Sequence, residues 1–324
     1  MSKSRSLPPA LKQLIKSPLY PRRPSRSNPS RILPVGRSPD PLFPPKNEIL
    51  SQLFSGIRNQ ADQLGLGWAE WLSLTTATLL TLNSPASLQA LHRMAVGIDP
   101  SQSTPTGQPA LNLTERTERA CLMREVGLKC IGFIGIPKVI NNLAALRAVV
   151  DEDQELASAL PREPRRQISP ERNPRVNEAA YALWDDIYTP HSSKLLKILG
   201  KSHPDLPIFI VESEYGPLFS SPSSFSLPND PKHLSTEPSW EVNRLRTSLV
   251  AIAALRAQGG VGPQVTSHVW GLMKARDSIQ PHDPNKKGLE WLTSEEGAIW
   301  VVKAVDGVSI ISLQHRISGS QRKD

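Results

Sequence analysis

Apolar residues recur at intervals of three and four positions through most of this chain, and that spacing is typical of amphipathic helices. It is clear in residues 48–96, 117–150, 177–199 and 244–275. Pro85 suits the first turn of a helix, where its missing N–H costs nothing. We therefore predict an all-α fold.

Two segments follow the helical spacing less plainly. Residues 298–305 and 308–313 are rich in β-branched residues and flank Asp306-Gly307, a dipeptide that favours the tight turn of a β-hairpin. We predict a small C-terminal β-hairpin there. The apolar segment 206–216 is short enough to form either a helix or a strand.

The stretch from Arg244 to Ala275 predicts two helices that meet at a corner. Gly259-Gly260 ends the first helix, because glycine enters left-handed backbone regions without steric cost. Pro263 then suits the first position of the second helix. This helix-corner-helix stretch is the most informative part of the chain.

Residues 117–150 show the same pattern about 126 positions earlier. When Pro137 is set against Pro263, the inward positions of the two second helices coincide. The aligned pairs are Val139 with Val265, Asn142 with His268, Leu143 with Val269, and Leu146 with Leu272. We interpret this as a diverged internal repeat, in which each two-helix unit buries its apolar stripe against its copy. Chance similarity between two amphipathic helix pairs is the alternative.

Proline and charge mark the predicted boundaries along the chain. Residues 1–47 form a basic leader rich in proline and serine, and 151–175 form a charged, proline-rich surface linker. The first helical half then covers 48–150, the second covers 176–290, and the hairpin and tail cover 291–324.

The net charge of +8 is concentrated in the leader. Nine of the 38 basic residues lie within the first 39 positions, which hold no acid, so the rest of the chain is close to neutral. A nucleic-acid partner is therefore disfavoured for the folded part. The leader has the composition of a mitochondrial transit peptide, and the alternative is a basic tail on a cytoplasmic protein. No stretch approaches the ~20 apolar residues of a membrane span.

The motifs of cofactor and metal chemistry are absent from the sequence. There is no glycine-rich phosphate loop and no His-Glu-x-x-His pattern, so we expect neither a cofactor nor a metal. Cys121 and Cys130 are nine positions apart on a predicted helix and cannot pair there. We interpret both as buried small apolar residues.

His268 is the main candidate for chemistry. It shares a helix face with Val265, Val269 and Leu272, so we expect it to point inward. One interpretation is a core imidazole hydrogen-bonded to its neighbours, and the other is a proton-transfer residue in a pocket. Among the other histidines, we expect His92 to be exposed.

The run 244–275 and the phrase Gly135-Ile-Pro-Lys-Val-Ile-Asn141 resemble the AhpD-like, or carboxymuconolactone-decarboxylase-like, proteins. The resemblance implies a helical homo-oligomer with a small-molecule substrate and a reactive histidine at His268. The cysteine pair of the family's peroxidases would fall on Val261 and Gln264, so thiol peroxidase activity is not expected. The family's usual glutamate falls near Ser248. The resemblance thus implies a degenerate active site.

Glu125 is the second candidate. It lies on the first helix of the 117–150 unit, near the place where the family carries its acid, and it would act as a proton shuttle if it faced the pocket of His268. The alternative is a surface carboxylate paired with Lys129 four residues on.

Two hypotheses of function follow. The first is acid–base chemistry on a small organic acid or lactone, with His268 as proton carrier and Glu125 as its weaker partner. The second is a non-catalytic scaffold or interaction protein in mitochondria. A solvent-connected pocket that holds His268 and a carboxylate would favour the enzyme; a dry histidine would favour the scaffold.

Overall fold

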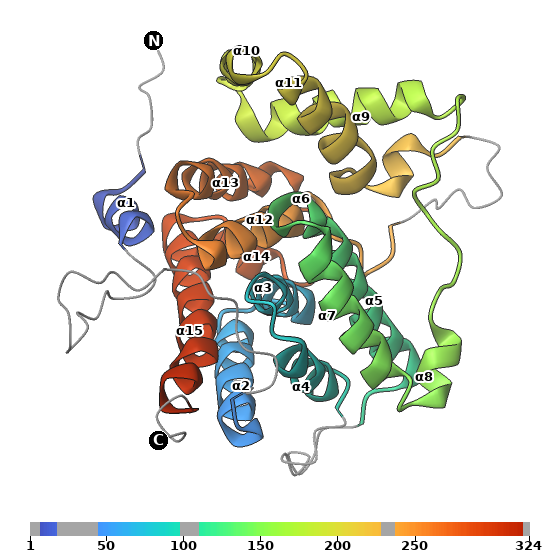
Figure 1. Cartoon of the computed structure of the whole chain (residues 1–324), viewed down its shortest axis with the longest axis vertical. Helices are drawn as coiled ribbons and strands as arrows, with labels where there is room; N and C mark the ends of the chain where they lie inside the picture. The colour runs from blue at the N-terminus through green and yellow to red at the C-terminus, as the bar shows by residue number, and fades with distance from the viewer. Residues whose placement is uncertain (1–6, 18–44, 98–109, 228–236, 320–324) are drawn as a thin grey trace.

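The computed structural model describes residues 7–17, 45–97, 110–227 and 237–319 of the 324-residue chain. Every regular element in these ranges is helical, which confirms the all-α prediction (Figure 1). The first half holds α1 Pro9–Lys16, α2 Asn47–Gln63, α3 Trp68–Thr81, α4 Pro85–Ala95, α5 Leu113–Lys129, α6 Ile131–Ile134, α7 Ile136–Val150 and α8 Gln154–Ala159. The second half holds α9 Asn173–Tyr188, α10 Ser192–Ser202, α11 Leu206–Ile208, the π-helix η1 Phe209–Phe219, the 3-10 helices η2 Pro222–Phe225 and η3 Ala275–Ser278, α12 Arg244–Gln258, α13 Gly262–Lys274, α14 Lys286–Leu292 and α15 Glu295–Gly319.

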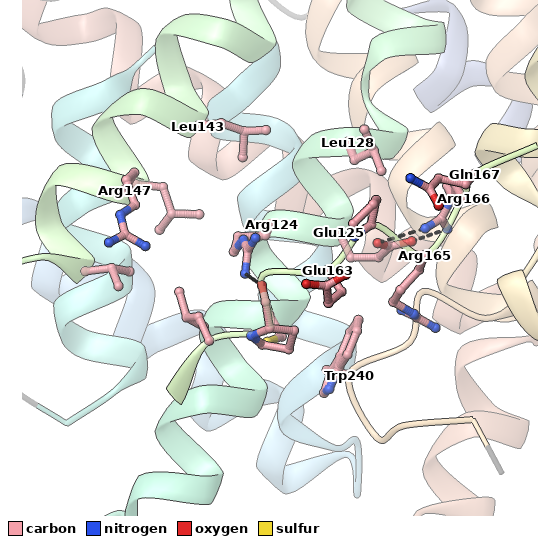
Figure 2. Close-up of a pocket in the computed structure, with 16 residues that line it drawn as sticks. Arg124, Glu125, Leu128, Leu143, Arg147, Glu163, Arg165, Arg166, Gln167 and Trp240 are labelled. Carbon is pink, nitrogen blue, oxygen red and sulfur yellow. Dashed lines mark hydrogen bonds and ion pairs between the residues drawn. The ribbon is translucent and has the colours of Figure 1, made fainter. Parts of the chain in front are cut away.

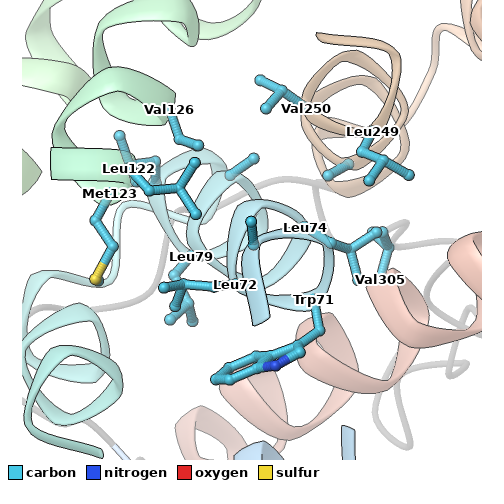
Figure 3. Close-up of a cluster of buried hydrophobic side chains, with 14 of the residues drawn as sticks. Trp71, Leu72, Leu74, Leu79, Leu122, Met123, Val126, Leu249, Val250 and Val305 are labelled. Atoms are coloured by element: carbon cyan, nitrogen blue, oxygen red, sulfur yellow. The ribbon is translucent and has the colours of Figure 1, made fainter. Parts of the chain in front are cut away.

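Helix α3 lies at the centre of the fold. Its residues from Ala69 to Thr81 are all buried, and α2, α4, α5, α12 and α15 contact it (Figures 1 and 3). Thr75, Thr78 and Thr81 each donate a hydrogen bond of 2.8 Å to the carbonyl four residues earlier. These bonds satisfy hydroxyls that have no access to water, so α3 can be covered on all sides.

The two predicted helical halves share a hydrophobic core. Buried side chains of α2 to α5, α7, α12, α13 and α15 form a single cluster, which Figure 3 shows around α3. A smaller cluster joins α9 to η1 through Trp184, Val211 and Tyr215, among others. The segment 206–216, which the sequence left open, is helical.

The structure contains both predicted helix-corner-helix units. In the first unit, α5 and α6 end at Gly135, with φ 80° and ψ 162°, before α7 begins. In the second unit, α12 ends at Gly259, with φ 73° and ψ 167°, before α13 begins. Both corners therefore use nearly the same positive-φ conformation, which only glycine adopts without strain.

Three of the four aligned pairs are buried in both units, whereas Leu143 is half-buried and its counterpart Val269 is fully buried. The buried pairs are Val139 with Val265, Asn142 with His268, and Leu146 with Leu272. The amide of Asn142 donates to Asn83 Oδ1 at 3.1 Å and to the Lys138 carbonyl at 2.8 Å. Asn142 and His268 are thus polar residues at equivalent buried places.

The predicted C-terminal hairpin is wrong, because residues 298–313 lie within helix α15. The buried residues Ala298, Val301, Val302, Val305 and Val308 follow helical spacing and pack in the main core. Asp306, expected in a turn, accepts two hydrogen bonds from Arg256 of α12, at 2.7 and 2.8 Å. Tertiary packing on a buried helix stripe outweighs the β preference of valine and isoleucine.

Part of the predicted leader packs on the body. Helix α1 buries Leu11 and Ile15 in the main core, and Leu7 before it is buried as well. Arg256 donates to the carbonyls of Ile15 and Ser17, at 3.2 and 3.0 Å. Residues 1–6 and 18–44 of the leader lie outside the described residues, and the transit-peptide interpretation stays a prediction.

The predicted linker 151–175 is more than a surface connection. It contains α8, whose Leu156 and Ala157 are buried together with Leu160. Beyond α8, the chain runs past α5 towards α9 (Figure 1). Within the described residues, no helix is long and apolar enough to cross a lipid bilayer.

Candidate functional site

His268 lies on α13 and points inward, as its spacing predicts. Only 5% of the residue is exposed. Pro263 lies in the first turn of α13, and the preceding glycines turn the chain back along α12. The corner thus holds the histidine against aromatic residues of α6, α9 and η1.

An aromatic cluster surrounds the imidazole. Its Nε2 lies 3.3 Å from the hydroxyl of Tyr188, and that hydroxyl lies 2.7 Å from the hydroxyl of Tyr215. Phe133 stands edge-on to the imidazole, with 5.8 Å between ring centroids. Nδ1 is buried without a hydrogen-bond partner among the described residues. The cluster is therefore polar only along the line from His268 through the two phenols.

Burial keeps this cluster uncharged at neutral pH. Desolvation, aided by the nearby Arg244 guanidinium, lowers the pKa of His268 to about 4. Desolvation also raises the pKa of Tyr188, and raises that of Tyr215 well above its usual value. These groups can orient one another, but near pH 7 they neither gain nor lose a proton readily.

Arg244 is the charged side chain nearest in effect to the imidazole, and it has its own partners. It donates to Ser248 Oγ at 2.8 Å and to the Gly271 carbonyl at 3.0 Å, and it pairs with Asp186. Ser248, at the expected position of the family's glutamate, is fully buried. The arginine therefore ties α12 to α13 and α9 beside the imidazole.

Glu214 lies near the cluster, one residue before Tyr215 on η1. Burial raises the pKa of its carboxyl group, and its Oε2 is buried without a hydrogen-bond partner among the described residues. A β-carbon at Gly132 would lie only 2.4 Å from that oxygen. Glu214 is thus held against α6, with no hydrogen bond to His268.

Neither of the two positions expected for the family's cysteine pair carries a thiol. Gln264 is exposed and Val261 is half-buried at the start of α13. Cys121 and Cys130 are free and buried, as predicted. Burial raises the pKa of the Cys121 thiol to about 11 and raises that of Cys130 further, so neither is a reactive thiolate.

Glu125 does not pair with Lys129. Its carboxylate binds Arg166 through two nitrogens, one of them at 3.2 Å, as the dashed lines of Figure 2 show. Lys129 is fully buried and donates to the carbonyls of Phe219 and Val242 and to Thr247 Oγ1, at 2.6, 2.8 and 3.2 Å. Burial lowers the pKa of Lys129 to about 8. The expected surface pair is therefore wrong, because both side chains have partners distant in sequence.

The structure keeps the two candidate residues apart. Glu125 lines a cavity of about 450 Å³ between α5, α7 and residues 160–167, and His268 is not part of that lining (Figure 2). A second cavity, of about 390 Å³, includes neither residue. Within the described part of the chain, no hydrogen bond joins His268 to a carboxylate.

The prediction that His92 is exposed is also wrong. Only 2% of it is accessible, and both ring nitrogens lack partners among the described residues. Burial, with a smaller effect of Arg93, lowers its pKa to about 4. The error arose because His92 precedes a basic residue, whereas α4 buries this face against its neighbours. His191 and His203 are exposed at the ends of α10.

Sequence reasoning missed the residues that complete these sites. Tyr188 lies in the predicted helical stretch 177–199, and Arg244 is the first residue of the run 244–275. Helical spacing does not predict which residues these two side chains contact. Arg166 lay in a stretch predicted to be a linker. Helical periodicity predicts which face of a helix points inward, but it does not predict which residues of other elements pack against that face.

No group of three or more metal-ligating side chains occurs among the described residues. No family model, no curated protein and no solved structure matches the chain. The AhpD-like resemblance consequently rests on the residues of the two corners.

Proposed function

We propose that this chain is a diverged AhpD-like protein of mitochondria that acts by binding other molecules rather than by proton transfer at His268. The observation that carries the proposal is the environment of the imidazole. His268 is enclosed by aromatic rings, bonded to Tyr188, and absent from the lining of both cavities.

That environment suits a structural residue better than a general base. A general base needs a pKa near the working pH and direct reach, or reach through one water, to the proton it removes. The pKa of His268 is lowered to about 4, and the hydroxyl beside Nε2 belongs to the protein itself. Proton transfer at this position would require the aromatic cluster to open.

Exposed apolar side chains favour an interaction role. Ile136 and Ile140 lie one helical turn apart on α7 and are 57% and 60% exposed. Ile208 at the end of α11 and Phe209 at the start of η1 are 50% and 62% exposed. Neighbouring exposed apolar residues of this kind are characteristic of contact surfaces, including those of the homo-oligomer that the family resemblance implies.

Complementation of a deletion strain tests the proposal. Strains carrying His268→Gln or Glu214→Gln should show the same untargeted metabolite profile as the wild type, because neither residue would take part in chemistry. Circular dichroism and the melting temperature of each purified variant provide the folding control. A folded His268→Gln protein that reproduces the metabolite changes of the deletion would refute the proposal and restore acid–base chemistry on a small organic acid or lactone.

Localisation needs its own measurement. A C-terminally tagged chain should fractionate with mitochondria and should lose this location when the nine basic residues of positions 1–39 are replaced by glutamine. Unchanged fractionation of that variant would contradict the transit-peptide interpretation.

A further inference from the structure

The cavity beside Glu125 combines an apolar floor with a basic rim. Helices α5 and α7 supply the floor through Leu128, Leu143, Leu146 and Val150. Four arginines and two glutamates complete the charged lining: Arg124, Arg147, Arg165, Arg166, Glu125 and Glu163. A volume of about 450 Å³ lies within the range of sites for small organic molecules.

Two of the arginines build the wall. Arg166 pairs with Glu125, and Arg165 pairs with Glu241, a residue that is almost completely buried. Arg165 also stacks over the ring of Trp240, with 4.5 Å to its centroid. These contacts fix the segment 160–167 against α5, so the wall of the cavity is formed before any ligand arrives.

The other two arginines remain available to a ligand. Arg124 donates to the Pro161 carbonyl at 3.1 Å and has no carboxylate partner among the described residues. Arg147 pairs with Asp151 four residues on, but both side chains are about half exposed. An exposed pair of this kind stabilises little, so its guanidinium can turn to another anion.

We propose that this cavity binds an organic anion with one carboxylate and an apolar body. The carboxylate lies between Arg124 and Arg147, whose guanidinium groups come from neighbouring helices (Figure 2). The apolar body covers Leu143, Leu146 and Val150. Arginine matches the planar geometry of a carboxylate, and hydrocarbon burial supplies most of the affinity.

Isothermal titration calorimetry of the full chain with decanoate tests the assignment. Decanol serves as the control that has the apolar chain without the carboxylate, and acetate as the control that has the carboxylate without the long chain. We expect decanoate to bind at one site, at least about tenfold more tightly than either, because a charge-assisted hydrogen bond and hydrocarbon burial each contribute. Equal affinity for decanoate and decanol, or for decanoate and acetate, would overturn the proposal.

Charge-matched variants locate the site. The double substitution Arg124→Gln with Arg147→Gln should weaken decanoate binding by roughly tenfold or more and leave decanol binding unchanged. Arg162→Gln with Arg276→Gln removes the same charge from exposed arginines outside the lining and should change affinity less than about twofold. Similar losses in the two double variants, or no loss in the first, would refute this site.

Glu163 gives a test with the opposite sign. It is an exposed acid on the same rim, so Glu163→Gln should tighten decanoate binding a few-fold at low salt, and added salt should reduce the gain. Weaker binding in Glu163→Gln would contradict the position assigned to the carboxylate. None of these measurements involves His268, so they test the cavity independently of the function proposed above.

Discussion

The two helix-corner-helix units have similar backbones and very different surroundings. Their corners share a positive-φ glycine, and three of their four aligned pairs are buried in both units. Yet α13 of the second unit exposes only Pro263 and Gln264, whereas the equivalent helix of the first unit, α7, exposes Ile136 and Ile140 and borders the cavity. The local sequence pattern therefore specifies the helix-corner-helix unit. The elements that pack around each unit decide whether its outer face is buried in the core or lines a cavity.

Lys129 joins the two units, and its loss should have the largest effect. Lys129→Ala removes the ammonium group that binds Phe219, Val242 and Thr247 and leaves a cavity in the interior. We expect the free energy of unfolding to fall by about 3–5 kcal/mol in urea denaturation.

Lys138→Ala is the matched control for that variant. Lys138 also donates to a backbone carbonyl, that of Thr81 at 2.8 Å, but it is only half-buried. Its loss should cost about 1 kcal/mol. Equal losses of unfolding free energy in the two variants would show that the buried contacts of Lys129 between the units stabilise the fold no more than the half-buried contact of Lys138 does.

Isoleucine truncation compares a buried position of the second unit with an exposed position of the first. Ile252→Ala in α12 removes a fully buried side chain and should cost about 2–5 kcal/mol. Ile140→Ala in α7 removes an exposed one and should stay within about 0.5 kcal/mol. Alanine suits both helices, so the difference reports burial. If the two variants unfold at the same denaturant concentration, α7 is covered in solution, as a homo-oligomer would require.

The pH dependence of stability should distinguish the two units, because the second carries the titratable His268 where the first carries Asn142. The folded-state pKa of His268 is lowered from 6.5 to about 4, so its contribution is complete above pH 6.5 and is lost as the pH falls through 4. The loss amounts to roughly 3 kcal/mol. Since the first unit carries an asparagine at the equivalent place, His268→Asn should remove this part of the acid sensitivity.

His92 is the internal control for that titration, because its pKa is lowered to about 4 as well. Its contribution should remain in the His268→Asn protein and disappear in His92→Asn. Denaturation curves between pH 7 and 4 measure both. A His268→Asn protein with the full acid sensitivity of the wild type would contradict the burial of the imidazole.

The corner glycines should give the smallest difference between two matched variants. Gly135→Ala and Gly259→Ala both place a β-carbon at positive φ, and the nearest atom to either β-carbon is at ordinary contact distance or farther. Each should therefore cost only the backbone strain, about 1–3 kcal/mol. A clear difference in melting temperature between them would show that the corners are not equivalent.

The sequence predicted the parts of the fold that local spacing encodes. Both units, their glycine corners and the inward face of α13 follow from helical periodicity and from the special backbone of glycine. The burial of Cys121 and Cys130 follows from the same reasoning. Such features depend on residues a few positions apart, which a single sequence displays.

The failures share a physical cause. The helix around Asp306 depends on Arg256, the orientation of Glu125 depends on Arg166, and the hydrogen bond of His268 depends on Tyr188. These partners are 50, 41 and 80 residues away. Local preference for a turn or an i,i+4 pair is worth less than one buried, charge-assisted contact, so tertiary partners override it.

The central position of α3 has a consequence for the synthesis of this protein. Arg246 at the start of α12 donates to Glu70 in α3, across 176 residues of chain, and α15 follows later still. On the ribosome, α3 therefore emerges long before the helices that cover it. A nascent chain of 240 residues has this fully buried central helix incompletely covered, a state that aggregates readily and that chaperones protect.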